Sequence, residues 1–114
     1  MVISQGEVWW TDFGPADGSG PAFARPAVIV QSDSFNRSRV RTVVCVPLTT
    51  SLQWADAPGN VAIDAALTCL DRDSVANVSQ IMTVDRSRLR DRVGVLPART
   101  VEAILDGIVV VLGR

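Results

Sequence analysis

About the first four-fifths of the chain alternates hydrophobic and polar residues in short runs, and a period of two predicts β-strands. The runs are rich in valine, isoleucine, threonine and tryptophan, which favour a pleated, half-buried surface. About six short strands are therefore expected, over residues 7–13, 27–31, 41–49, 60–64, 74–84 and 92–96. The segment 74–84 is interpreted as one strand or as a bent pair.

Two long segments between these strands contain glycine and proline and are predicted to be loops, over residues 14–24 and 50–59. Arg25 and Pro26 precede the second strand, a position where proline removes no donor from the sheet. Residues 32–38 form a shorter polar connection. Loops on a rigid sheet often carry the functional residues of a protein, so candidate chemistry is sought at the ends of these two loops.

The period changes near the C-terminus, where apolar residues recur every three or four positions. Pro97 suits the first turn of a helix and Gly113 its end, so one amphipathic helix is expected between them. Strands followed by a single helix favour a mainly β (α+β) fold: a compact, strongly curved antiparallel sheet or a small barrel of about six strands, packed against that helix. Residues 1–114 are expected to form a single domain, because the length suits one hydrophobic core.

Composition narrows the functional classes more than it narrows the fold. The net charge is −1 and 47% of the residues are hydrophobic, which is typical of a folded globular chain. The chain shows no signal peptide and no apolar stretch of the roughly 20 residues that span a bilayer, so a soluble, cytoplasmic protein is expected.

The chain contains no histidine, which excludes serine triads, Cys–His pairs and two-histidine ribonuclease chemistry. Its two cysteines, Cys45 and Cys69, suggest neither a disulfide scaffold nor a metal site, and no metal or cofactor is expected. All 11 cationic side chains are arginine, which suits bidentate phosphate contacts, although biased codon composition explains the missing lysine equally well.

Two features flank the long loops and are candidates for phosphate chemistry. Arg25 ends the first loop, and the hydroxyl residues Thr49, Thr50 and Ser51 begin the second. A forked guanidinium and nearby hydroxyls can converge on the oxygens of one phosphate. The alternative is that Arg25 forms a surface ion pair and Thr49 belongs to a turn.

Five segments, in this order and spacing, resemble the MazF/PemK family of toxin ribonucleases from bacterial type II toxin–antitoxin pairs. They are residues 6–13 (GEVWWTDF), 25–33 (RPAVIVQSD), 46–50 (VPLTT), 71–75 (DRDSV) and 80–85 (QIMTVD). The resemblance extends over nearly the whole chain, and the C-terminal helix falls where the family has one.

The resemblance implies an SH3-like or CcdB-like barrel, a homodimer, and single-stranded RNA bound along a groove across the dimer interface. It also implies cleavage at short recognition sequences and inhibition by a cognate acidic, MazE-like antitoxin. The family's catalytic arginine and threonine fall on Arg25 and Thr49, and Ser51 is a further candidate contact to RNA. No metal is needed, because the RNA's own 2′-OH can attack the adjacent phosphorus.

The proton acceptor in such a reaction is not evident. Some family members carry a glutamate in the first loop, and the only carboxylate in that loop here is Asp17. Trp54 in the second loop is a candidate for stacking on an unpaired base, or else it packs against the barrel or a protein partner. Arg37 is a further candidate phosphate contact, and a solvated position is the alternative.

Two other groups of residues have competing interpretations. Trp9 and Trp10 must face opposite sides of the first strand, so one is expected in the core and the other against a second copy of the chain rather than RNA. The arginines at positions 86, 88, 90 and 92 are expected in a solvated turn with ion pairs to Asp85 and Asp91, and the alternative is that they form part of a surface that steers RNA.

Two rival functions remain at this point. A CcdB-like toxin would bind DNA gyrase and would need neither Arg25 nor Thr49. A non-catalytic RNA-binding domain would keep the groove without the reaction.

Overall fold

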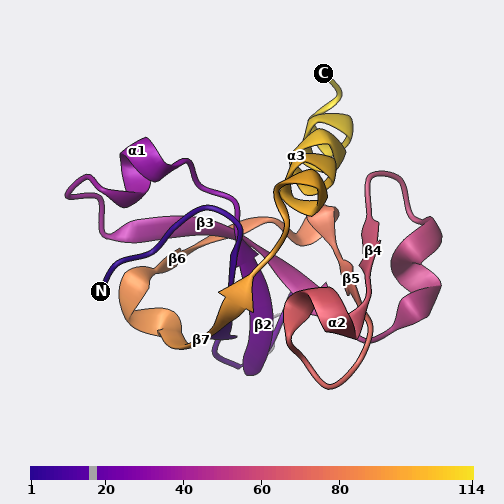
Figure 1. The fold of residues 1–114 in the computed structure, drawn as a ribbon, viewed down its shortest axis with the longest axis horizontal. Coiled ribbons are helices and arrows are strands. Elements are labelled where there is room, and N and C mark those ends of the chain that lie inside the picture. The colour runs from indigo at the N-terminus through magenta and orange to yellow at the C-terminus, as the bar shows by residue number, and fades with distance from the viewer. Residues whose placement is uncertain (16–17) are drawn as a thin grey trace.

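A computed structural model of the chain describes residues 1–15 and 18–114. Seven antiparallel strands form one curved sheet, and a C-terminal helix packs on it (Figure 1). The strands are β1 (Glu7–Asp12), β2 (Ala24–Ile29), β3 (Thr42–Thr49), β4 (Val61–Ile63), β5 (Ser74–Ala76), β6 (Met82–Asp85) and β7 (Leu89–Val95). The mainly β fold with a C-terminal helix is confirmed, and the segment 74–84 is the bent pair β5 and β6.

Two of the three helices are single turns of four residues, and only the C-terminal helix is long. The helices are α1 (Asp33–Asn36), α2 (Ala65–Thr68) and α3 (Ala98–Leu112), with 3₁₀ turns η1 (Leu52–Asp56), η2 (Val78–Gln80) and η3 (Arg86–Arg88). The sequence predicted only α3 among these, because a helix of four residues is too short to show a period. No helix of the described residues is long and apolar enough to cross a membrane.

The strand order is β4-β5-β3-β2-β1-β7, and β6 also pairs with β3. The strands β4 and β7 therefore stand at the two ends of the hydrogen-bonded path, so the sheet is open. The strand β7 begins at Leu89, three residues before the predicted start, because its backbone pairing with β1 extends to Thr11 opposite Leu89. Arg90 donates to Asp12 at 3.1 Å, and Arg92 donates to Glu7 at 2.8 Å.

The expected ion pairs of these arginines with Asp85 and Asp91 are therefore wrong. Sequence proximity favoured those carboxylates, but the pairing of β1 with β7 brings Asp12 and Glu7 closer.

Glu7 is buried, which by itself raises the pKa of its carboxyl. Hydrogen bonds from Arg92 and Trp9 outweigh burial and hold that pKa below its ordinary value.

The period of two divides the core between the two faces of the sheet. On the helix side, Val8, Val28 and Val46 pack with Ile104 and Ile108 of α3. On the other face lies a second cluster, whose members are Ile3, Trp9, Ala27, Ile29, Val43, Cys45, Val84 and Leu89. The opposite orientations expected of the first strand's two tryptophans are confirmed.

Cys45 is a buried hydrophobic residue, as expected from its apolar surroundings. Burial raises the pKa of its thiol to about 12. The thiol is therefore protonated at neutral pH and chemically inert.

One close backbone contact joins α3 to the sheet. A Cβ at Gly107 would lie 2.0 Å from the carbonyl oxygen of Gly59, which itself has a φ of +82°. Only glycine at both positions permits this approach. The contact fixes the segment before Asn60, a residue that organises the site described next.

Candidate functional site

A pocket of about 440 Å³ opens where β2 begins and β3 ends. We call it the Arg25 pocket. Its lining residues are Ser19, Arg25, Thr49, Ser51, Trp54, Ala57, Asn77, Ser79 and Gln80. Four of the six candidates drawn from the sequence line this one pocket: Arg25, Thr49, Ser51 and Trp54.

The antiparallel register of β2 and β3 explains why Arg25 and Thr49 meet. The last recorded pair of these two strands is Ala27 with Pro47. Continuing that register by two residues aligns Arg25 with Thr49, and side chains opposite each other lie on the same face of a sheet. Two residues 24 positions apart in the sequence therefore line the same pocket.

The hydroxyl of Thr49 is oriented by the turn that follows it. Its Oγ1 accepts a hydrogen bond of 3.1 Å from the backbone N–H of Ser51. Since a hydroxyl both accepts and donates, the hydrogen of Thr49 stays available for an acceptor in the pocket. Ser51 is itself exposed at the pocket edge, so a second hydroxyl lies beside the first.

Arg25 is half-buried and is the only charged residue among the nine that line the pocket. Within residues 1–15 and 18–114, no carboxylate forms an ion pair with it. The polar groups that line the pocket with it are hydroxyls, amides and an indole. These groups are neutral, so they leave the positive charge of Arg25 uncompensated. An arginine held in this way attracts an anion, and its planar fork matches two phosphate oxygens.

Asn60 ties the two 3₁₀ turns of the pocket wall together. Its Nδ2 donates to the Trp54 carbonyl oxygen at 2.9 Å, and its Oδ1 accepts from the Val78 N–H at 3.0 Å. Gln80 donates to the carbonyl oxygen of Ser19 at 3.0 Å, which joins the first loop to η2. These bonds hold the walls in place before any ligand binds, which lowers the entropic cost of binding.

Trp54 is 49% exposed at the mouth of the pocket. Its backbone is held by Asn60 while its indole remains open to solvent. The arrangement presents an aromatic face next to the single cationic group.

Besides the apolar Ala57, sequence reasoning missed four polar lining residues: Ser19, Asn77, Ser79 and Gln80. Gln80 lies in a segment that resembles the family, so a signal was present but carried no role. The other three are small polar residues in turns, and such residues are common in any loop.

One sequence candidate among the described residues, Arg37, does not line the Arg25 pocket. Arg37 follows α1, has a side chain 74% exposed and lies 4.0 Å from Asp33. Asp17 lies outside the residues that the structure describes. Among the described lining residues there is no carboxylate, so the pocket supplies charge stabilisation and hydrogen bonds without a named proton acceptor.

Comparison with known proteins identifies the chain's relatives. Residues 4–112 match the family described as the PemK-like, MazF-like toxin of type II toxin–antitoxin systems. The chain is 45% identical over 108 residues to a Mycobacterium tuberculosis protein named Endoribonuclease MazF6, covering 95% of each chain.

Solved structures agree with this relationship. An endoribonuclease in complex with its cognate antitoxin, from a mycobacterial species, is similar with a TM-score of 0.76 and 27% identity, over 97% of this chain and 95% of that one. The fold of MazF from Deinococcus radiodurans is similar with a TM-score of 0.84 at 22% identity, over 100% and 99% of the two chains. The chain belongs to the family of PemK-like, MazF-like toxins of type II toxin–antitoxin systems.

Proposed function

We propose that this toxin, an endoribonuclease like its named relatives, cleaves single-stranded RNA in the Arg25 pocket without a metal ion. One observation carries the proposal: a half-buried arginine lies on the same sheet face as a threonine hydroxyl that is free to donate. The rest of the lining is neutral and rich in hydrogen-bonding groups. A phosphodiester flanked by unpaired bases is the ligand that fits this combination.

In the proposed reaction, the 2′-oxygen of the RNA attacks the adjacent phosphorus and the bond to the 5′-oxygen breaks. The products are a 2′,3′-cyclic phosphate and a free 5′-OH, with one proton lost from the 2′-oxygen and one gained by the 5′-oxygen. Arg25 stabilises the negative charge that builds on the phosphoryl oxygens, and Thr49 donates one further hydrogen bond. A preorganised contact from a charged group of this kind contributes roughly 10²- to 10³-fold in rate, and the neutral hydroxyl contributes less.

Trp54 and the amides of η2 bind the nucleotides around the scissile phosphate in this proposal. An exposed indole stacks on any unpaired base, with an effect of about 1–3 kcal/mol per base. Asn77 and Gln80 present both donors and acceptors, which suits hydrogen bonding to base edges. Ser51 adds a hydroxyl beside Thr49.

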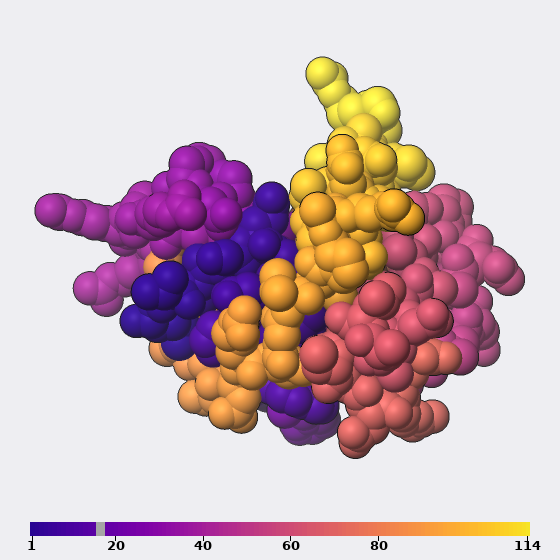
Figure 2. Space-filling model, in the orientation of Figure 1, coloured from indigo at the N-terminus to yellow at the C-terminus, as the bar shows by residue number. Residues whose placement is uncertain are grey.

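The toxin is proposed to act in the cytoplasm as a homodimer. The α1 segment and α3 project from the same side of the molecule with a hollow between them (Figure 2). A pocket of about 420 Å³ at this place is mostly apolar, with Phe35 and Leu105 on its opposite walls. The adjacent end of α3 exposes Val110 and Leu112, so a second copy would cover hydrophobic residues that are otherwise in water.

The substitution Val110→Asp places a charge on this apolar surface. It is therefore expected to convert the dimer into a monomer, which light scattering measures as a halved mass.

An acidic segment of a cognate antitoxin is proposed to occupy the Arg25 pocket. The mycobacterial relative is known in complex with its cognate antitoxin. A carboxylate and a phosphate compete for the same guanidinium fork, so occupation by the antitoxin blocks RNA. An antitoxin segment that folds on binding can cover a long groove. Because ordering the segment costs entropy, its affinity stays moderate and it can dissociate again.

The test is incubation of the pure protein with a long single-stranded RNA in the presence of EDTA. Discrete fragments ending in cyclic phosphates support the proposal. Intact RNA together with inhibited DNA gyrase would establish the CcdB-like alternative. RNA that is bound and never cut would establish a non-catalytic RNA-binding domain.

A further inference from the structure

A second, smaller pocket lies on the opposite face of the same strand ends. It has a volume of about 170 Å³, and its main walls are Trp10, Pro26, Leu48, Leu70 and Arg72. We call it the Trp10 pocket. We propose that it binds one unstacked nucleobase of the RNA, next to the scissile phosphate, and so helps to set the recognition sequence. The proposal rests on the proposed function of the Arg25 pocket.

The sheet register places the two pockets back to back. Trp10 pairs with Pro26, and continuing the β2–β3 register by one residue aligns Pro26 with Leu48. These three side chains form a row across β1, β2 and β3. The next row contains Arg25 and Thr49 and faces the other way, because successive residues of a strand alternate between faces.

The two pockets therefore share a short edge of the molecule. Pro26 follows Arg25 directly in the chain, and Thr50, which lines the Trp10 pocket, lies between Thr49 and Ser51 of the Arg25 pocket. An RNA strand whose phosphate contacts Arg25 needs to cross only this strand edge for a neighbouring base to reach Trp10. A single-stranded RNA can make this turn because its bases are free to splay apart.

The chemistry of the Trp10 pocket suits a base better than a phosphate. Its floor is apolar, and Trp10 is 39% exposed there. Asp71 and Arg72 are exposed at its edge, and within the described ranges neither belongs to an ion pair. A carboxylate accepts from an exocyclic amino group, whereas an arginine donates to ring nitrogen and carbonyl acceptors. Together they read the edge of a base that stacks on the indole.

The size of the pocket suits a single base. Pockets for drug-sized ligands have volumes of roughly 300–1,000 Å³, and this one is smaller, at about 170 Å³. One base inserted from a bound RNA strand is enough to fill it.

This assignment differs from the expectation that the exposed tryptophan of β1 contacts a second copy of the chain. Trp10 lies in a concave pocket with Asp71 and Arg72 at its edge. Charged residues are depleted in the centres of protein–protein interfaces, so this surface is a poor centre for a dimer. The exposed apolar residues of α3 are better suited to that role.

The test compares cut-site maps of a long single-stranded RNA for the unaltered toxin, Trp10→Leu and Arg72→Gln. Both variants are expected to lose selectivity at the same single nucleotide position beside the cut, with selectivity at the other positions retained. For the preferred sequence, kcat/KM should fall about 10- to 100-fold in Trp10→Leu, the range expected for one lost stacking contact. Arg99→Gln, which changes an exposed arginine that lines neither pocket, is the matched control for Arg72→Gln and should leave the map unchanged.

A second measurement uses RNA with an abasic residue at that position. For the unaltered toxin, kcat/KM should fall by most of the same 10- to 100-fold factor when the abasic RNA replaces the intact one. For Trp10→Leu, kcat/KM should be nearly the same on the two RNAs, because the stacking contact is already missing. Because Arg72 is exposed, Arg72→Gln keeps the test valid if Trp10→Leu fails to fold.

Unchanged maps for both variants would overturn the base pocket. So would a loss that is equal at every position and accompanied by a change of oligomeric mass, which would place Trp10 in a dimer contact. Failure of the proposed function would give a different result. In that case the unaltered toxin would leave RNA uncut, or Arg25→Ala would cleave RNA as fast as the unaltered toxin.

Discussion

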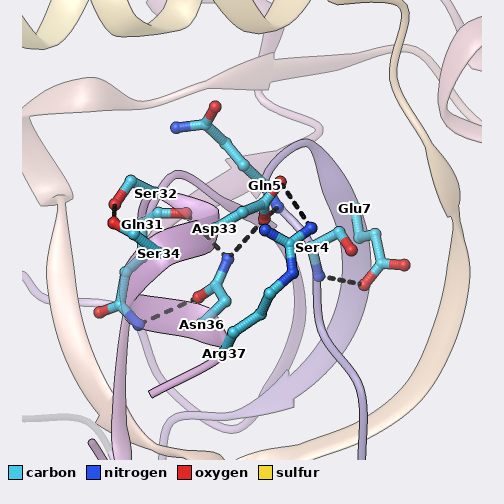
Figure 3. A network of polar contacts seen from close by, with 9 residues as sticks. All are labelled: Ser4, Gln5, Glu7, Gln31, Ser32, Asp33, Ser34, Asn36 and Arg37. Carbon is cyan, nitrogen blue, oxygen red and sulfur yellow. Dashed lines mark hydrogen bonds and ion pairs between the residues drawn. The ribbon is translucent and has the colours of Figure 1, made fainter.

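The Arg25 pocket and the segment around α1 are both polar, yet their hydrogen bonds are arranged in opposite ways. Around α1, Asp33 accepts from the backbone N–H of Gln5 at 2.7 Å and from Asn36 at 3.1 Å, and Arg37 lies beside it (Figure 3). In the pocket, Arg25 forms no ion pair with any described carboxylate.

The α1 network is closed upon itself. Asn36 donates to the carbonyl oxygen of Gln31 and accepts from its side chain, which leaves few polar atoms for a ligand. Hydrogen bonds from Gln5 and Asn36 hold the pKa of Asp33 below its ordinary value, so the charged form stabilises the fold. A polar cluster that satisfies its own groups fixes structure, whereas one that keeps donors free is prepared for a ligand.

Among substitutions in the two regions, those at Arg25 are expected to have the largest effect on RNA cleavage. Arg25→Ala should lower kcat for RNA cleavage about 10²- to 10³-fold, because it removes the only cation among the described residues that line the pocket. Arg25→Lys keeps the charge without the planar fork and should recover only part of the rate. Quantified fragment formation under single-turnover conditions is the measurement. A rate near that of the unaltered toxin in Arg25→Ala would remove this residue from the site, provided circular dichroism shows a folded protein.

Thr49 should follow with a smaller effect. Thr49→Ala removes one neutral donor and is expected to lower kcat roughly 10- to 100-fold, with little change in KM if the contact forms mainly in the transition state. Thr49→Ser keeps the hydroxyl that accepts from the Ser51 N–H and should retain most of the activity. If Thr49→Ser is as slow as Thr49→Ala, the methyl group and its packing matter instead of the hydroxyl.

In the α1 network, Asp33→Ala should lower the stability of the fold and leave the rate of RNA cleavage unchanged. The free energy of unfolding should fall by about 1–2 kcal/mol at pH 7, because two donors lose their acceptor. The pKa of Asp33 is lowered in the folded state, so its contribution is present above the ordinary value of about 4 and is lost as pH falls through the folded pKa.

Urea unfolding at several pH values measures that contribution. The difference between Asp33→Ala and the unaltered toxin should shrink below about pH 4. A difference that stays constant down to pH 2 would mean that the charge of Asp33 plays no part.

The smallest effect is expected from Arg37, which the sequence offered as a phosphate contact. Its side chain is 74% exposed and 4.0 Å from Asp33, and a surface pair of this kind contributes about 0–1 kcal/mol. Because Arg37 does not line the Arg25 pocket and solvent screens its exposed charge, Arg37→Ala should change kcat/KM for RNA less than about twofold. A loss of tenfold or more would show that the RNA path extends to α1 and that the two regions act together.

Local pattern was enough for the strands, the C-terminal helix and the alternation of the first strand. Val8 and Trp9 face different cores because side chains alternate along any strand, and α3 ends at Gly113, whose φ of +76° suits glycine. The family resemblance singled out Arg25 and Thr49 among 11 cationic residues and many hydroxyls. Those inferences depend on neighbours in the sequence or on motifs, so no tertiary contact was needed to make them.

Other features depended on which strands lie side by side. The ion-pair partners of Arg90 and Arg92 were wrong at the level of sequence because β1 pairs with β7, and no pattern in either strand encodes that choice. The role of Asn60 in joining η1 to η2, and the position of Pro26 behind Arg25 in a second pocket, likewise require the folded sheet. A polar side chain finds its partner only when the whole chain has packed, whereas the tendency of a segment to form a strand or a helix is already present in its own residues.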